Sequence, residues 1–270
     1  MTFAEKLKGL MGARGPGLCV GLDPDPARLP AQFPRHLSGV AAFLEEVIKV
    51  SAPYAAAYKV NTAFFEAMGS PGWRLLEEIA LQLPSGCLRI ADAKRGDIGN
   101  TAQKYAEAFF QQMPFDAVTV SPYLGGDSLQ PFLSDPAKGA FVLVLTTNPG
   151  SKDLQYFGDE NNELYLHVLK RIPQWAPANN LGAVVGATHP DELLAIRRQF
   201  PSVPLLIPGI GAQGGDTEVI RAMPYGVHHA PVLVNISRSL LYADKSEDFP
   251  QNVLQACRHY QHALGIAEHD

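Results

Sequence analysis

Residues 88–101 read Leu88-Arg89-Ile90-Ala91-Asp92-Ala93-Lys94-Arg95-Gly96-Asp97-Ile98-Gly99-Asn100-Thr101. The segment begins as a largely apolar run and ends in a charged group that includes Asp92, Lys94 and Asp97. A short run of this kind predicts a strand buried on both faces of a parallel sheet. Side chains alternate in direction along a strand, so Asp92 and Lys94 share one face and Ala93 points away. The segment therefore predicts a buried strand that presents polar groups at its C-terminal end.

Similar apolar runs recur along the chain and alternate with amphipathic stretches. The predicted strands are Leu18–Leu22, Ala55–Val60, Leu88–Ala93, Ala117–Val120, Phe141–Leu145, Leu181–Val185, Pro204–Ile207 and Val232–Ile236. The predicted helices include Val40–Val50, Gly72–Leu83, Thr101–Gln112, Leu164–Trp175, Pro190–Phe200, Asp216–Met223 and Phe249–Leu264. This alternation predicts an α/β fold, a (β/α)8 TIM barrel, with residues 1–270 as a single domain.

A doubly wound open sheet is the alternative that gives the same alternation. That fold, when it binds a dinucleotide, needs a G-x-G-x-x-G loop after the first strand, and none follows Leu22. The barrel is therefore preferred. The longest irregular stretch, about Thr146 to Glu160, follows the fifth strand, and it is either a lid over the site or a simple surface insertion.

Composition limits the partners of the chain. Hydrophobic residues make up 46% and charged residues 18% of the sequence, so a sizeable core is expected and disorder is not. The net charge of -5 argues against a basic face that holds nucleic acid. A phosphate-bearing substrate must then be bound by a local cluster of donors.

Cysteine usage and hydropathy indicate the compartment. Cys19, Cys87 and Cys257 show no C-x-x-C spacing, so neither a disulfide framework nor a zinc site is indicated, and Cys19 and Cys87 are predicted to be core thiols. The first residues lack the apolar run of a signal peptide, and no apolar span is long enough for a bilayer. We expect a cytoplasmic protein with no membrane contact.

Polar residues gather where the predicted strands end, which is where TIM barrels place their active sites. The first strand is followed by Asp23, the second carries Lys59 and Asn61, and the third continues into the pattern Asp92-x-Lys94-x-x-Asp97. A surface ion pair at a strand end is the alternative for this pattern. Charges at the end of a buried run need partners, which favours a charged site.

The last two strands are followed by groups suited to an anion. Pro208-Gly209-Ile210-Gly211-Ala212-Gln213-Gly214-Gly215-Asp216 brings exposed backbone N–H groups and the Gln213 amide, and Asn235-Ile236-Ser237-Arg238-Ser239 brings a guanidinium. TIM barrels commonly bind phosphate between these two loops. A glycine hinge beside an exposed arginine is the alternative.

The histidines give no metal pattern. His228 and His229 are adjacent and are interpreted as solvated loop residues, while His189 is either at the mouth of the barrel or at the start of a helix. No nucleophile elbow, P-loop or metalloprotease motif is present.

These segments resemble the orotidine 5'-phosphate decarboxylases. The resemblance includes Leu22-Asp23, Lys59-Val60-Asn61, the segment from Asp92 to Thr101, Thr147-Asn148-Pro149-Gly150, the glycine-rich loop and Ser237-Arg238, in that order over about residues 18–242. It implies decarboxylation of orotidine 5'-phosphate to UMP in pyrimidine biosynthesis, without a cofactor or metal, by a homodimer with shared active sites.

The resemblance also implies a role for each matched residue. A catalytic tetrad would consist of Lys59, Asp92, Lys94 and Asp97, with Asp97 reaching the neighbouring subunit's site. The substrate-binding residues would be Asp23, Lys59 and Thr101 at the ribose (Thr101 from across the dimer), Thr147 at the pyrimidine amide, Ile98 and Pro208 at the base, and Gln213, Ser237 and Arg238 at the phosphate.

Two positions depart from the family pattern. Thr147 stands where many members carry serine, and Asn235-Ile236-Ser237-Arg238 replaces the Gly-Arg-Ser form of shorter bacterial members. The chain in this respect resembles a longer bacterial subgroup.

Two other functions remain open on sequence grounds. The related sugar-phosphate lyases share the Asp-x-Lys-x-x-Asp strand but use Mg²⁺, with an acidic ligand where this chain has Lys59. A noncatalytic phosphate-ligand sensor is the other alternative, although a pure binder has little need for clustered charges.

Overall fold

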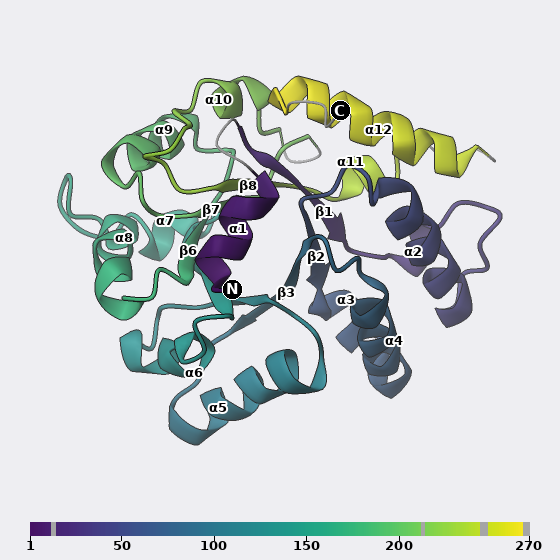
Figure 1. The fold of residues 1–270 in the computed structure, drawn as a ribbon, viewed down its shortest axis with the longest axis horizontal. Coiled ribbons are helices and arrows are strands. Elements are labelled where there is room, and N and C mark those ends of the chain that lie inside the picture. Colours follow the sequence, from purple (N-terminus) through teal and green to yellow (C-terminus); the bar gives the residue numbers. More distant parts are fainter. Residues whose placement is uncertain (12–14, 212–213, 244–247, 267–270) are drawn as a thin grey trace.

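The computed structural model describes residues 1–11, 15–211, 214–243 and 248–266. Within them eight parallel strands close into a barrel in sequence order, and β8 pairs with β1 (Figure 1). The strands are β1 (Gly17–Leu22), β2 (Ala57–Asn61), β3 (Leu88–Arg95), β4 (Ala117–Val120), β5 (Gly139–Leu145), β6 (Leu181–Val185), β7 (Leu205–Ile207) and β8 (Val232–Ile236). The predicted (β/α)8 barrel is confirmed.

Helix α1 precedes the first strand, and the other helices follow the strands and cover the outside of the barrel (Figure 1). They are α1 (Phe3–Met11), α2 (Leu37–Ser51), α3 (Thr62–Glu66), α4 (Gly69–Gln82), α5 (Gly99–Glu107), α6 (Gln130–Leu133), α7 (Ser151–Leu154), α8 (Leu164–Trp175), α9 (Pro190–Gln199), α10 (Thr217–Arg221), α11 (Arg238–Leu241) and α12 (Phe249–Leu264). Short 3-10 turns cover Pro26–Arg28 and Gly126–Leu129, and a π-helical turn, Ala108–Gln112, extends α5.

The predicted bounds hold for β4, β6, β8, α8 and α12, and elsewhere the ends differ. β2 begins two residues later than predicted, at Ala57, where pairing with Leu88 of β3 starts. β3 runs two residues beyond the predicted end at Ala93 because its pairing with β4 resumes at Arg95. β7 has only three residues, since Pro204 and Pro208 flank it and proline has no N–H for the ladder.

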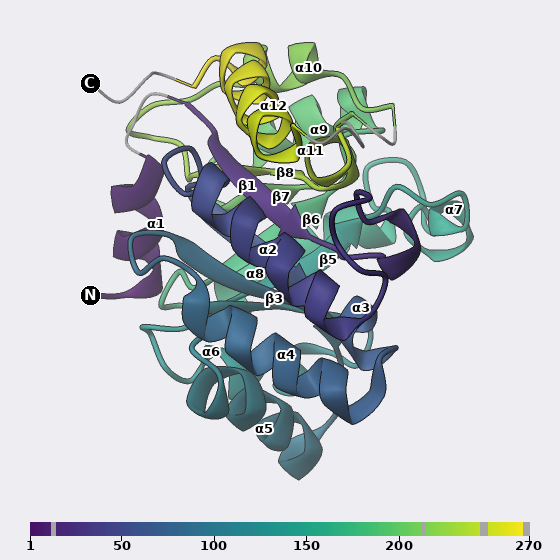
Figure 2. The same cartoon turned by 90° about the vertical axis from the view of Figure 1, so that its right-hand side faces the viewer.

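Helix α1, which the sequence analysis did not predict, closes one end of the barrel. Phe3 and Leu7 are buried against inward-facing side chains at this end of the barrel. The rings of Phe3 and Phe141 pack edge to face, with their centroids 6.1 Å apart. A side chain at Gly139 of β5 would collide with the Phe3 ring, so glycine is required there. Figure 2 shows α1 on the opposite side of the barrel from α7. The other end of the barrel is left open for a site.

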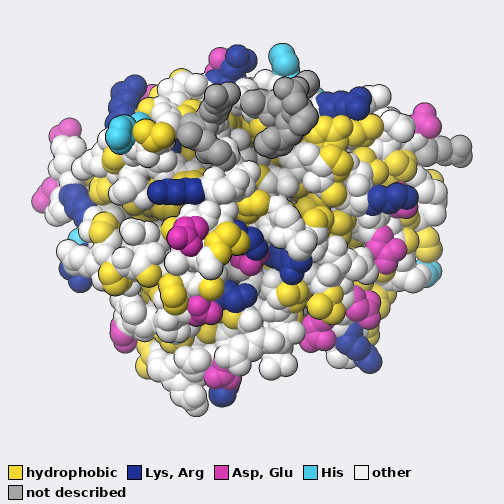
Figure 3. Space-filling model, viewed as in Figure 1, with side chains coloured by type: hydrophobic (Ala, Val, Ile, Leu, Met, Phe, Trp, Pro, Cys, Tyr) yellow, Lys and Arg dark blue, Asp and Glu magenta, His cyan; other side chains and the backbone are white. Residues whose placement is uncertain are grey.

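Charge is mixed on the face seen in Figure 3, where lysine and arginine side chains lie among aspartates and glutamates and do not gather in one patch. This agrees with the negative net charge of the sequence. Among the described helices, none has the length and apolar character needed to cross a bilayer.

Candidate active site

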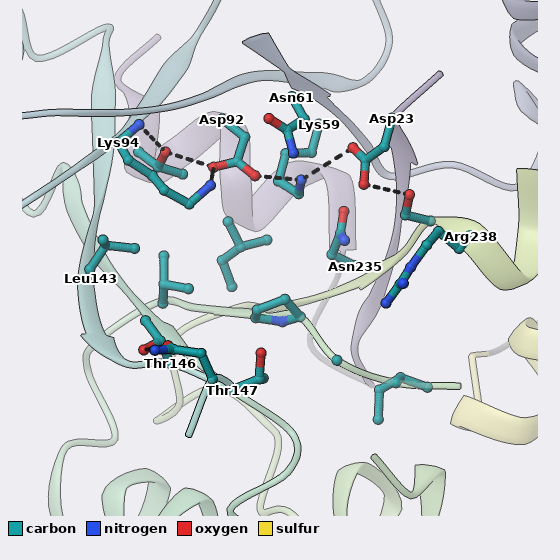
Figure 4. Close-up of a pocket in the computed structure, with 18 of the residues that line it drawn as sticks. Asp23, Lys59, Asn61, Asp92, Lys94, Leu143, Thr146, Thr147, Asn235 and Arg238 are labelled. Atoms are coloured by element: carbon teal, nitrogen blue, oxygen red, sulfur yellow. Dashed lines mark hydrogen bonds and ion pairs between the residues drawn. The ribbon is translucent and has the colours of Figure 1, made fainter. Parts of the chain in front are cut away.

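A cavity of about 490 Å³ opens where the barrel strands end (Figure 4). Its size suits a nucleotide-sized ligand. The lining residues come from β1 to β8 and the loops after them, and they are Asp23, Lys59, Asn61, Asp92, Lys94, Thr119, Leu143, Thr146, Thr147, Asn148, Gln155, Val184, Leu206, Pro208, Gly209, Ile210, Asn235, Ser237 and Arg238. The position matches the C-terminal face predicted from the sequence.

Asp92 is the centre of the charged group in this cavity. Its Oδ2 accepts a hydrogen bond from Lys59 Nζ at 2.8 Å, and its Oδ1 accepts one from Lys94 Nζ at 2.6 Å. Lys59 Nζ lies 3.9 Å from Asp23 Oδ1 on its other side. The charges therefore alternate in sign along one wall of the cavity, as Figure 4 shows.

The two lysines differ in exposure, and the carboxylate between them holds its charge. Burial alone would lower the pKa of Lys59, but Asp92 and Asp23 outweigh it and raise that pKa above its usual range. Burial alone would raise the pKa of Asp92, but the ammonium groups of Lys59 and Lys94 lower it well below its usual range. The side chain of Lys94 is 52% exposed, against 5% for Lys59. Lys94 is thus the cation that faces the open cavity.

The backbone of Lys94 is in the left-handed region, with φ of 48°. A non-glycine residue held there costs on the order of 1–3 kcal/mol and persists only where its surroundings fix it. The Lys94 N–H donates a hydrogen bond to Thr119 Oγ1 at 2.9 Å. The unusual backbone therefore occurs at the residue that the sequence places at the centre of the chemistry.

Asp23 lies where β1 meets β8. Its Oδ2 accepts a hydrogen bond from Ser237 Oγ at 2.6 Å, and its Oδ1 is buried without a hydrogen-bond partner within the described part of the chain. A buried carboxylate oxygen that lines a cavity and has no hydrogen-bond partner is suited to accept a hydrogen bond from a hydroxyl group of a ligand. Ser237, a predicted substrate-binding residue, lines the same cavity, and its hydroxyl donates to Asp23.

The loop after β5 supplies Thr146 and Thr147 on the wall opposite Lys59 (Figure 4). Gln155 fixes this loop, since its Oε1 accepts from the Thr146 N–H and its Nε2 donates to Thr146 Oγ1, both at 2.8 Å. His189 Nε2 lies 2.9 Å from the Thr146 carbonyl oxygen. His189 is at the N-terminus of α9, the second of the two places the sequence left open, and it joins the loops after β5 and β6.

The side of the cavity formed after β7 and β8 contains the predicted anion-binding groups. Pro208, Gly209 and Arg238 line it, and the φ angles of Gly209 and Gly211 are 100° and 76°, which only glycine adopts without strain. Arg238 is exposed at the start of α11, and Figure 4 shows it at the opposite end of the pocket from Lys94. Gln213, the other predicted phosphate ligand, lies outside the described residues.

Three predicted residues are not brought into the chain's own cavity. Asp97, Ile98 and Thr101 do not line it; Ile98 is 59% exposed, and the Asp97 carboxylate accepts a hydrogen bond from the Ile98 N–H. Tyr123 and Leu124, in the loop after the neighbouring strand β4, are also exposed. One chain thus leaves a polar and apolar group uncovered beside its site.

Several lining residues were not predicted as site residues. Thr119 lies two residues after Ala117, which is packed inside the barrel, so the two side chains share the inward face of β4. Asn61, Asn148 and Asn235 stand within motifs that the sequence analysis quoted without giving them a role. Gln155 lies in the long loop and carried no signal.

The histidines and cysteines left over from the sequence lie elsewhere. His228 is exposed and His229 lines a separate cavity, so neither faces the site. Cys19, Cys87 and Cys257 are buried free thiols, which confirms the prediction for Cys19 and Cys87.

Comparison with known proteins identifies the family. Residues 16–248 match the model of the Orotidine 5'-phosphate decarboxylase / HUMPS family. The chain belongs to this family. It is 43% identical over 271 residues to an orotidine 5'-phosphate decarboxylase of Dehalococcoides mccartyi, covering 98% of this chain and 97% of that protein. One from Roseiflexus castenholzii is 44% identical over 270 residues, with 99% and 98% covered.

A solved structure agrees with the family assignment. The OMP decarboxylase of Leishmania donovani superimposes with a TM-score of 0.83 at 35% identity, over 99% of this chain and all of that one. Family membership and fold thus agree with the resemblance found in the sequence.

Proposed function

We propose that this chain decarboxylates orotidine 5'-phosphate to UMP, as its relatives' names describe for them. The observation that carries the proposal is the position of Lys94. Its side chain is half exposed, and its ammonium lies 2.6 Å from Asp92, at the opposite end of the pocket from Arg238 (Figure 4). A nucleotide bound through its phosphate at Arg238 would extend its base toward Lys94.

The chemistry follows from where the charge develops. Breaking the bond between C6 and the carboxylate releases CO2 and leaves an electron pair at C6 in the plane of the ring, which the π system cannot delocalise. An ammonium fixed beside C6 stabilises that pair and then transfers its proton to C6, which forms UMP. The neutral Lys94 amine regains a proton from solvent. No metal or organic electron sink enters this scheme.

Asp92 has two roles in the proposal. It keeps Lys94 charged and in place through the 2.6 Å ion pair. It would also lie close to the substrate carboxylate, and the repulsion between them would fade as CO2 leaves. We give stabilisation of the transition state the larger weight.

Binding of the distant phosphate contributes to catalysis by driving closure. The loop after β5 begins at Thr146, and the loop after β7 begins at Pro208. Both residues line the cavity. Closing these loops over the ligand would use phosphate binding energy to exclude water from the base.

We also propose a homodimer in which Asp97 and Thr101 complete the neighbouring subunit's site, with one barrel domain per chain. Support comes from the position of both residues outside their own cavity and from the exposed side chains of Ile98, Tyr123 and Leu124, which follow the paired strands β3 and β4. Mixing K94A with D97A subunits tests this. Half of the randomly mixed dimers would hold one intact site, so about a quarter of the wild-type activity should return. No recovery after demonstrated subunit exchange would count against shared sites.

The decisive test of the activity follows loss of orotate absorbance with orotidine 5'-phosphate in the presence of EDTA. Wild type should turn over the substrate, and K94A should lose at least about 1000-fold in kcat. Activity that EDTA abolishes and Mg²⁺ restores would instead favour the sugar-phosphate lyases. The ammonium of Lys59, which lies between Asp23 and Asp92, argues against a metal there. Cytoplasmic location remains a prediction.

A further inference from the structure

The pairing of β3 with β4 is interrupted at the site. Ala91 is opposite Val118 and Arg95 is opposite Val120, so Asp92, Ala93 and Lys94 all stand opposite the single residue Thr119. A bulge of this kind leaves backbone groups of the longer strand without ladder partners. The ladder resumes where the Ser121 N–H donates to the Arg95 carbonyl oxygen.

The Thr119 side chain fills the gap in the ladder. Its hydroxyl accepts the Lys94 N–H at 2.9 Å and donates its own hydrogen to Asp92 Oδ1, also at 2.9 Å. One hydroxyl group therefore contacts both members of the ion pair, the backbone of one and the carboxylate of the other. Thr119 itself is 1% exposed, so solvent does not readily replace it.

Within the described part of the chain, Lys94 is held by the ion pair of its ammonium with Asp92 and by the hydrogen bond of its backbone N–H to Thr119. The Lys94 side chain is half exposed and its backbone is in the left-handed region, so the position of its ammonium depends on how the backbone is held. Asp92 Oδ2 is fixed by Lys59, but Oδ1 is shared by Lys94 and Thr119. Without the hydroxyl, the carboxylate could rotate toward Lys59.

We propose that Thr119 is a positioning residue, which holds the left-handed Lys94 backbone and the Asp92 carboxylate so that the Lys94 ammonium stays beside the reacting carbon. The inference rests on the proposed function for its catalytic consequence. Its structural part, the bond from the Lys94 N–H to the hydroxyl, can be tested without substrate.

The matched pair T119V and T119S isolates the hydroxyl. Valine keeps the branched shape of threonine and loses both bonds, whereas serine keeps the hydroxyl and loses a methyl group. We expect T119V to lower kcat by about 10- to 100-fold, since a hydrogen bond to a charged group is lost. KM should change by less than about 3-fold, because both bonds lost with the hydroxyl are made within the protein. T119S should recover most of the kcat.

Hydrogen exchange of the Lys94 amide supplies the readout that is independent of substrate. It should accelerate by at least about 10-fold in T119V and stay close to wild type in T119S. S51A serves as the control, because Ser51 is a buried hydroxyl that bonds to Tyr58 and the Val47 carbonyl away from the cavity. It should lower stability and leave kcat unchanged.

The outcomes separate the two claims. If T119V keeps kcat within about 2-fold of wild type, or leaves exchange at Lys94 unchanged, the positioning role is overturned. If the wild type fails to decarboxylate orotidine 5'-phosphate, the proposed function fails. The exchange measurement still decides whether Thr119 holds the Lys94 backbone.

Discussion

The substitution D92N removes the negative charge that lies between two ammonium groups. An asparagine of the same shape has one acceptor oxygen, and its NH2 group only donates. If the asparagine oxygen faces Thr119 and Lys94, its NH2 group faces Lys59 Nζ, which in the wild type lies 2.8 Å from Asp92 Oδ2. In either orientation an N–H donor points at a cation.

The size of the effect follows from the burial of the two lysines. Breaking a fully buried ion pair costs about 3–5 kcal/mol. Lys59 is 4% exposed, but Asp23 Oδ1 is 3.9 Å away and a small movement would bring the two together, so we expect the lower end of this range, about 3 kcal/mol. Loss of the Lys94 ion pair adds little to this destabilisation, because the Lys94 side chain is half exposed and can be hydrated.

Urea unfolding as a function of pH measures this cost and its origin. In the wild type the pKa of Lys59 is higher in the folded than in the unfolded chain. Its contribution to the free energy of unfolding is therefore complete below about pH 10.4 and is lost as the pH rises through the pKa of the folded state. The lowered pKa of Asp92 gives a contribution that is complete above about pH 3.9 and is lost as the pH falls. The wild-type pair should therefore contribute constantly between about pH 5 and pH 9.

The variant should behave differently, because Lys59 without a carboxylate partner loses its proton more easily. The difference in unfolding free energy between wild type and D92N should be largest near pH 7 and shrink toward pH 10. E66Q is the control: it weakens the Arg95–Glu66 pair, which is more exposed, and should cost at most about 1 kcal/mol. A D92N variant as stable as wild type at pH 7, or a difference that does not change with pH, would refute the reasoning.

Three further outcomes are expected. R238A should reduce kcat/KM for orotidine 5'-phosphate by at least about 100-fold while unfolding free energy changes by less than about 0.5 kcal/mol, since Arg238 is exposed; normal turnover would refute the phosphate assignment. F3A should cost about 3–5 kcal/mol in urea unfolding and leave kcat unchanged, because α1 closes the end of the barrel away from the site; a large kcat loss at full folding would contradict this. Burial raises the pKa values of Cys19, Cys87 and Cys257 to about 12, 11 and 12, so a thiol reagent at pH 8 should react only after denaturation; rapid reaction of native protein would contradict the burial.

The sequence predicted the barrel because its strands are short apolar runs between amphipathic helices, a pattern that is local in the chain. It did not predict α1, whose nine residues form a marginal helix alone and are stabilised by Phe3 and Leu7 packing on the distant β5 and its neighbours. Strand ends such as Arg95 were also missed, since they depend on pairing with another strand.

The site was predictable to the extent that one strand determines it. That Asp92 and Lys94 share one face follows from alternation along β3, and the glycine-rich segment after β7 was visible in the sequence as a candidate anion site. The contact of Ser237 with Asp23 depends on β8 closing against β1, more than two hundred residues apart in the chain. The roles proposed for Asp97 and Thr101 involve a second chain, so only the resemblance suggested them.

The two lysines on either side of Asp92 are not equivalent, and the difference decides which of them can act as the acid. Lys59 is almost fully buried between two carboxylates that raise its pKa, so loss of its proton would leave those charges uncompensated in the barrel. Lys94 contacts one oxygen of Asp92 and is half exposed to the cavity, where its proton can reach a ligand and be replaced from solvent. Lys59 therefore fixes the charge of Asp92, and Lys94 is the lysine placed to transfer a proton.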